Sequence, residues 1–203
     1  MTTNQRCAAG LGTIVGSAIA GQLMTRDFAH AEAAYKSAHN LPLTYRLPAK
    51  SLPADFPIEH ARLRNLPWIT GVFVFATAAY GFSLASPTTT SLRGWIAVPL
   101  TLQFFIAAAS NAVFALNQTL VADLCPGRGA SSTAVNNLVR CGLGAVGVAL
   151  VEMMIDGVGS APAFLGLALV TVIFVPLVVM NWFWGMRWRA TKMGEGEALV
   201  EKV

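Results

Sequence analysis

The chain has 203 residues, of which 55% are hydrophobic and only 12% charged, and its mean hydropathy is +0.57. A soluble globular protein carries about 25% charged residues, so this composition excludes a soluble domain as the main body of the chain. The net charge of +4 does not indicate nucleic-acid binding, because the basic residues lie at the ends of apolar stretches rather than along one face.

Five apolar stretches are each long enough to cross a bilayer, since a helix needs about 20 mostly apolar residues to span roughly 30 Å of hydrocarbon. We therefore predict an all-α integral membrane protein with five transmembrane helices. We expect a first span in 1–24, a cytoplasmic connector in 25–66, a four-helix transmembrane bundle in 67–186 and a cytoplasmic tail in 187–203, disordered after 193. The apolar stretches are 7–24, 68–85, 94–117, 133–155 and 163–183.

The basic residues divide unequally between the two sides of this topology. Eleven Lys and Arg residues fall in 25–66, 118–132 and the tail, whereas two fall before the first span or after the second. Because cytoplasmic loops carry the excess of Lys and Arg, we expect the connector and the C-terminus to be cytoplasmic. The N-terminus then lies outside without a signal peptide ahead of it, and we expect further spans upstream.

The first span is rich in small residues, with Gly12, Gly16 and Ala20 recurring at every fourth position on one helical face. Such faces allow helix backbones to approach closely in lipid, where packing drives association. We expect this face to contact a partner helix that the chain itself lacks.

The connector is too long for a tight turn. We expect a short amphipathic helix on the membrane surface in 28–38, followed by a partly mobile segment that four prolines between 42 and 57 keep irregular. Near its end, Glu59 can pair with Arg62 one helical turn later.

The third predicted span carries polar side chains at depths where each costs free energy unless it finds a partner. Such a residue is either a hydrogen-bonding contact between helices or part of the lining of a substrate cavity, and the sequence leaves both open. The residues concerned are Gln103, Ser110, Asn111, Asn117 and Gln118.

The fourth predicted span contains the most informative polar group, Asn136, Asn137 and Arg140. Asn136 and Arg140 are four residues apart and share a helical face. A charge at the bilayer centre costs about 2.5–3.5 kcal/mol on the insertion scale, so Arg140 either pairs across a helix interface or snorkels to the cytoplasmic interface. Glu152 is the acidic residue that we place inside a span.

Three stretches carry a family resemblance: GSAIAGQLMTRD in 16–27, DFPIEHARLR in 55–64 and NQTLVADLCPGRGASSTAVNNLVRC in 117–141. They resemble the C-terminal half of a fungal major facilitator superfamily transporter of the twelve-span drug:proton antiporter type. The first is similar to the eighth span and its loop motif, except that Thr25 replaces the usual Asp and weakens the charge network. The other two resemble the start of the ninth span and the junction of the tenth and eleventh. The first seven spans are expected to be missing.

The resemblance implies the major facilitator fold, in which two halves enclose a substrate near the membrane midplane and rock against each other. It implies export of small amphipathic organic compounds by proton-coupled alternating access, in the plasma membrane. Candidates for the substrate cavity are then Gln103, Asn111, Asn117 and Gln118, with Glu152 for proton coupling. Candidates for structural or gating roles are Gly16, Gly21, Arg26, Asp27, Asn136, Asn137 and Arg140.

A different interpretation is a non-transporting, truncated membrane protein, or a partner of a full-length transporter. We expect no enzymatic activity, because no His/Asp/Glu cluster, Ser–His pair or HExxH motif occurs in or beside the spans, and we expect neither cofactor nor metal. The expected partners are the lipid bilayer, a small-molecule substrate, protons and a missing N-terminal half or a full-length paralogue, but no nucleic acid.

Overall fold

The computed structural model describes residues 3–40, 42, 56, 58–86, 94–124 and 129–200, and in these residues the regular secondary structure is entirely helical. Five of the helices are long and apolar enough to cross a membrane, as the sequence predicts. The helices are α1 Thr3–Ala38, α2 Ile58–Leu63, α3 Leu66–Ala85, α5 Ala97–Leu124, α6 Gly129–Val158 and α7 Ser160–Val200.

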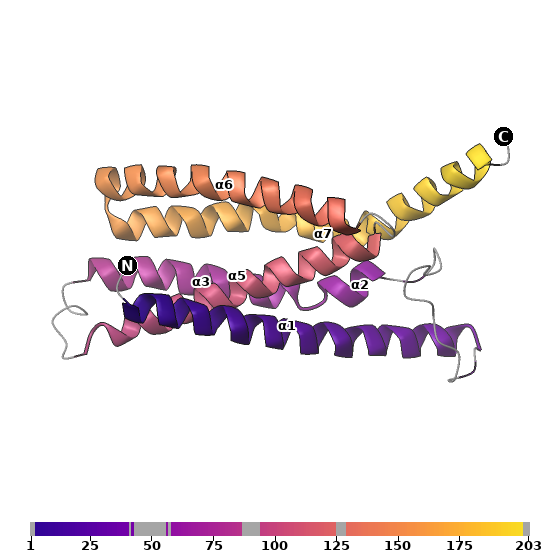
Figure 1. Ribbon diagram of the computed structural model, residues 1–203, viewed down its shortest axis with the longest axis horizontal. Helices are drawn as coiled ribbons and strands as arrows, with labels where there is room; N and C mark the ends of the chain where they lie inside the picture. Colours follow the sequence, from indigo (N-terminus) through magenta and orange to yellow (C-terminus); the bar gives the residue numbers. More distant parts are fainter. Residues whose placement is uncertain are drawn as a thin grey trace.

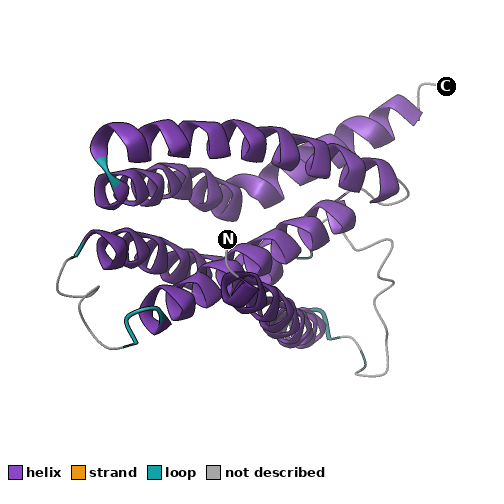
Figure 2. Cartoon of the chain, turned by 60° about the vertical axis from the view of Figure 1, so that its left-hand side comes forward, coloured by secondary structure: helices purple, strands orange, loops and turns teal. Residues whose placement is uncertain are grey.

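Figures 1 and 2 show the long helices in two groups, with α1, α3 and α5 in one and the α6–α7 hairpin in the other. The contact of α1 with α5 is the most extensive between any two helices, and α3 packs on both α5 and α7 and so joins the groups. The end of α1, α2, the start of α3 and the junction of α5 with α6 lie at one end of the molecule (Figure 1). The basic segments predicted to be cytoplasmic adjoin these helix ends.

Two predicted boundaries are wrong because helices continue further than their apolar stretches. α1 runs through to Ala38, so 28–38 extends the first span and does not form a separate surface helix. Alanines favour the helix there, and a salt bridge of 2.8 Å between Glu32 and Lys36, one turn apart, supports it. Likewise α7 continues to Val200 beyond the predicted start of disorder, and its last part projects from the bundle (Figure 1).

The small-residue face of α1 packs on α5, so the expectation that its partner helix is absent from the chain is wrong. A Cβ added at Gly16 would lie 2.2 Å from the backbone oxygen of Ala108, and one at Gly12 would lie 2.5 Å from that of Phe104. Ala20, next on this face, is fully buried. Gly12 and Gly16 therefore require glycine because two helix backbones meet there.

The described end of the connector contributes to the hydrophobic core at the α2 end, whereas 43–55, where we expect partial mobility, lies outside the described residues. Phe56 is 0% exposed and Ile58 1% exposed, and both pack in one cluster with Leu63, Leu66, Leu116 and Leu120. The Phe56 ring also contacts the rings of Phe28 and Tyr35 on the extension of α1, with 5.5 Å between centroids in each case. Phe56 and Ile58 therefore hold α1, α2 and α5 together.

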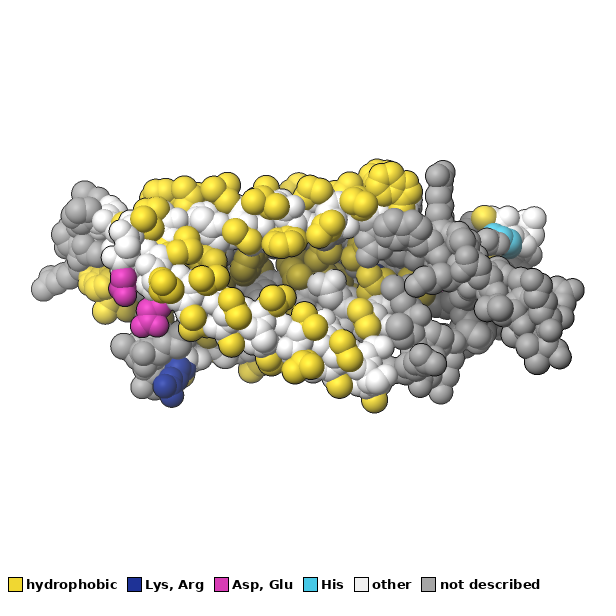
Figure 3. Space-filling model, turned by 90° about the horizontal axis from the view of Figure 1, so that it is seen from above, with side chains coloured by type: hydrophobic (Ala, Val, Ile, Leu, Met, Phe, Trp, Pro, Cys, Tyr) yellow, Lys and Arg dark blue, Asp and Glu magenta, His cyan; other side chains and the backbone are white. Residues whose placement is uncertain are grey.

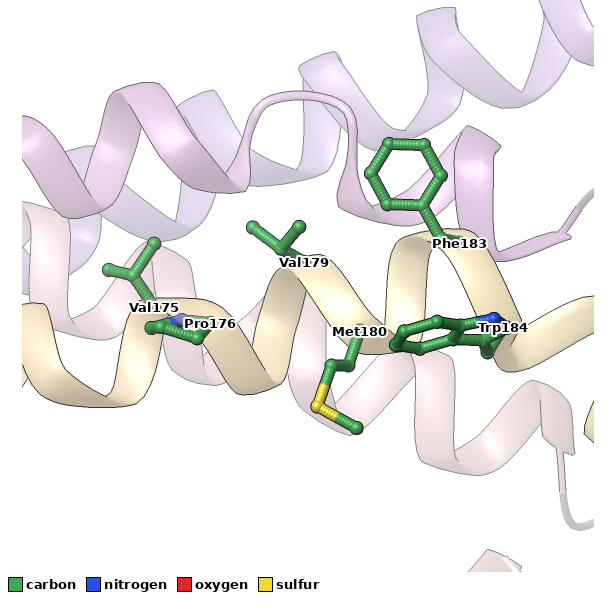
Figure 4. Close-up of a pocket in the computed structure, with 6 residues that line it drawn as sticks. All are labelled: Val175, Pro176, Val179, Met180, Phe183 and Trp184. Atoms are coloured by element: carbon green, nitrogen blue, oxygen red, sulfur yellow. The ribbon is translucent and has the colours of Figure 1, made fainter.

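Much of the remaining surface is apolar, as a lipid environment requires. Seen from above, the face over α6 and α7 is covered by apolar side chains (Figure 3). An open apolar pocket lies beside Pro176 inside α7 and is lined by residues of that helix alone (Figure 4). None of the predicted cavity residues lines it, so we do not assign a substrate to it. The lining residues are Val175, Pro176, Val179, Met180, Phe183 and Trp184.

Candidate functional site

Two polar contacts join α5 to α6. The Arg140 guanidinium lies over the Phe114 ring, with 4.5 Å between the guanidinium carbon and the ring centroid. One turn nearer the start of α6, the side-chain amide of Asn136 donates a hydrogen bond to Gln118 Oε1. The two residues on each helix are four apart, so one face of α6 meets one face of α5 in antiparallel register. Asn136 and Arg140 thus share a face, as their spacing predicts.

Arg140 lies well inside α6, about 16 Å along the axis from Gly129 at 1.5 Å per residue. It contacts the neighbouring helix through an aromatic ring and forms no salt bridge with any described residue. A cation over an aromatic ring is worth about 0.5–2 kcal/mol, whereas a charge at the bilayer centre costs about 2.5–3.5 kcal/mol. The Phe114 contact alone therefore leaves part of this cost uncompensated.

Asn137 presents a second unsatisfied group beside Arg140. Its Oδ1 is excluded from solvent and accepts no hydrogen bond from the described part of the chain. Because Asn137 lies three residues before Arg140, the two side chains are neighbours on the helix surface. A buried acceptor without a donor costs about 1–3 kcal/mol, so this site has both a cation and an acceptor available.

The polar residues of α5 differ in what they contact. The Asn111 amide donates to the Thr13 carbonyl oxygen at 3.0 Å and to Ser17 Oγ, which is the interhelical contact that polar side chains make in lipid. Gln118 is held by Asn136. Gln103 is partly buried and Asn117 exposed, and neither is hydrogen-bonded to a described side chain. A cavity role for these residues stays a prediction.

Glu152 is exposed near the far end of α6. It is twelve residues from Arg140, which corresponds to about 18 Å along the axis, and it does not neutralise that arginine. Figure 3 shows acidic side chains at the end where α6 and α7 join. The role of Glu152 in proton coupling stays a prediction.

A second charged cluster lies at the α2 end. Arg62 Nε donates to Asp123 Oδ2 on α5 at 2.9 Å, and the same guanidinium lies 4.9 Å from the centroid of the Phe28 ring. Arg62 therefore binds Asp123, and the side chain of Glu59, its expected partner, lies outside the described residues. Asn65, before α3, donates its side-chain amide to Asp27 on α1, so a hydrogen-bonded network is present despite Thr25.

The remaining predicted gating residues lie outside these contacts. Arg26 is exposed. A Cβ at Gly21 would meet no atom within 4 Å, in contrast to Gly16.

Sequence reasoning missed Phe114, because a phenylalanine in an apolar run carries no signal of its own. It also missed the pairing of Asp123, which is 61 positions from Arg62, although an acidic residue at the end of an apolar stretch is a detectable feature.

Comparison with known proteins identifies relatives among fungal transporters. The chain is 43% identical over 180 residues to Citrate exporter 1 of Aspergillus niger and 34% identical over 184 residues to MFS-type transporter phiD of a fungal species. It is 26% identical over 188 residues to MFS-type transporter tstD of Talaromyces stipitatus. These matches cover 89%, 89% and 93% of this chain but only 33%, 26% and 32% of the relatives. No family model matches the chain, and no solved structure matches it significantly.

The helices define the class of this molecule as a polytopic α-helical membrane protein. Its homologues are fungal MFS-type transporters, and the chain spans about a third of the length of the curated relatives it matches. The family resemblance found in the three sequence stretches is thereby confirmed.

Proposed function

We propose that the chain forms part of the membrane domain of a secondary transporter that moves small organic compounds. The observation that carries this proposal is the 43% identity over 180 residues to a fungal citrate exporter. The five helices long and apolar enough to span a membrane support it, as do the polar contacts that join α5 to α1 and α6 within those helices.

In this proposal, transport occurs by alternating access between two groups of helices. The relatives are about three times as long as the matched stretch, so further spans complete the transport path, either in the same polypeptide or in a full-length paralogue. α6 has no buried residue, which suits a helix that faces such spans. Gln103, Asn117 and Gln118 then line the path, Asp27 and Asn65 fasten its cytoplasmic end, and Glu152 carries the coupled proton.

The named substrate of one relative makes organic acids the first class of compound to test. We place the protein in the plasma membrane. We place its connector and C-terminus in the cytoplasm, because eleven of the basic residues lie on that side of the predicted topology and two on the other. Export in exchange for entering protons is the direction of transport that we propose.

Proteoliposomes with an acidic interior test this function directly. The chain is reconstituted alone and together with a full-length paralogue, and radiolabelled citrate is added outside. Proton exit drives citrate accumulation in an antiporter, and a protonophore abolishes it. Liposomes without protein and liposomes with the paralogue alone provide the controls. Accumulation above the matching control supports transport by this chain, and its absence in both preparations contradicts it.

The alternative function is that of a non-transporting membrane protein that associates with a full-length transporter. The lack of any buried residue on α6 suits such an association, because this helix offers a free face to another membrane protein. Its signature in the same assay is a chain that co-purifies with the paralogue and leaves the transport rate per paralogue unchanged.

A further inference from the structure

Two arginines of the described chain lie over phenylalanine rings, and only one of them is paired with a carboxylate side chain. Arg62 lies 4.9 Å from the Phe28 centroid and donates to Asp123 at 2.9 Å. Arg140 lies 4.5 Å from the Phe114 centroid and has no carboxylate among the described residues. The two sites have the same cation and the same aromatic support, and they differ in the anion.

The acidic residues of α5 and α6, the two helices that meet at Arg140, are either occupied or distant. Asp123, on α5, is bound to Arg62. Glu152 and Asp156, on α6, are twelve and sixteen residues further along, which places them about 18 Å and 24 Å away along the axis. Arg140 is therefore a cation within a predicted span, and no described side chain neutralises it.

The contact with Phe114 uses no hydrogen-bonding group of Arg140. The guanidinium carbon lies over the ring, 4.5 Å from its centroid, and the guanidinium N–H groups donate to no described residue. These N–H groups lie in the plane of the guanidinium and point outward from its edge. These N–H groups match the two oxygens of a carboxylate and bind it through paired, charge-assisted hydrogen bonds. Phe114 thus restricts the orientation of the cation without neutralising it.

We propose that Arg140, supported by Phe114, binds a carboxylate group of the transported compound and so makes the transporter selective for organic anions. This inference rests on the proposed transport function and adds to it the residue pair that selects the substrate class. A bound carboxylate supplies the charge that Asp123 supplies to Arg62. Binding of substrate then neutralises a cation inside the membrane-spanning region, and its release restores the charge.

Binding of radiolabelled citrate to the full 203-residue chain in lipid nanodiscs tests this inference separately from transport. Arg140→Gln should weaken citrate binding by about tenfold to a hundredfold, the range expected for loss of a charge-assisted contact. Arg64→Gln is the matched control, because Arg64 is an exposed arginine outside the predicted spans, and it should leave binding unchanged. Uncharged trimethyl citrate should not compete with citrate.

The outcomes separate the two proposals. Citrate binding that depends on Arg140, with no accumulation in proteoliposomes, supports the binding site and contradicts the transport function. Transport that is unaffected by Arg140→Gln, competition by the ester equal to that of citrate, or absence of citrate binding overturns the carboxylate site. If Arg140→Gln does not fold by circular dichroism, Arg140→Lys and Phe114→Leu replace it. Each should weaken binding several-fold, and unchanged affinity in both overturns the inference.

Discussion

The contact between α1 and α5 and the exposed helix α6 use the same kinds of residue in opposite ways. At the first, Gly12 and Gly16 meet the backbone of the opposing helix, and at the adjoining α2 end an arginine is neutralised by a carboxylate. On α6, Gly142, Gly144 and Gly147 have no atom within 4 Å of an added Cβ, and Arg140 has no carboxylate in the described chain. A small or charged residue inside a span therefore acquires its role from what the fold places against it.

The largest expected effect concerns the glycines of α1 and α6. Gly16→Ala should destabilise the protein by about 3 kcal/mol, the upper end of the usual range for overpacking, because its Cβ would lie 2.2 Å from a backbone oxygen that cannot move alone. Gly144→Ala should be neutral or stabilising by up to about 1 kcal/mol, since alanine favours a helix and nothing is near it. Thermal unfolding in detergent measures both. Equal effects would contradict the close contact of α1 with α5.

The salt bridge at the α2 end provides the second prediction. Arg62→Ala should destabilise the protein by about 2 kcal/mol, because it leaves Asp123 without its charged donor. Exchanging the charges in Arg62→Asp combined with Asp123→Arg should recover part of the loss, which a double-mutant cycle in the same unfolding assay measures. If the double variant loses as much unfolding free energy as the two single variants together, the pair carries no coupling energy.

We also expect Arg140 and Arg62 to affect different properties, citrate binding in the first case and stability in the second. Arg140→Gln should lower citrate binding while changing the unfolding temperature little, since α6 has no buried residue whose packing depends on it. Arg62→Gln should do the reverse, because its partners lie in the buried cluster at the α2 end. Binding and unfolding measured on the same two preparations test this. Loss of both properties in both variants would remove the distinction between the two arginines.

The spans, the family and the shared face of Asn136 and Arg140 could be predicted from the sequence, because hydropathy and helical spacing are local properties. The continuation of α1 to Ala38 could not, since a polar helix extending from the membrane loses the hydropathy signal while keeping its helix-forming residues. The pairing of Arg62 with Asp123 joins residues 61 positions apart, and it depends on the packing of α2 on α5, which no local sequence pattern encodes. For the same reason, Phe114 could not be recognised beside Arg140.

The smallest expected effect concerns Asn137. Its buried Oδ1 accepts no hydrogen bond from the described residues, and a hydroxyl group on the substrate can supply one. Citrate should therefore bind about fivefold more tightly than tricarballylate, which lacks only the hydroxyl, as expected for about 1 kcal/mol from one hydrogen bond. Asn137→Leu should remove this preference and preserve the requirement for charge. Competition against radiolabelled citrate measures both, and a preference that persists in Asn137→Leu would assign hydroxyl recognition elsewhere.

We expect Arg140 to lack an anion until a carboxylate substrate binds, and substitutions of Phe114 test this expectation. Phe114→Glu places a carboxylate where the ring now lies, and Phe114→Gln is the matched variant of similar size without the charge. Citrate binding in nanodiscs should fall by at least about tenfold in the Glu variant relative to the Gln variant, because a permanent ion pair would occupy the guanidinium. Equal citrate affinity in the two variants would contradict the claim that Arg140 binds the substrate through its charge.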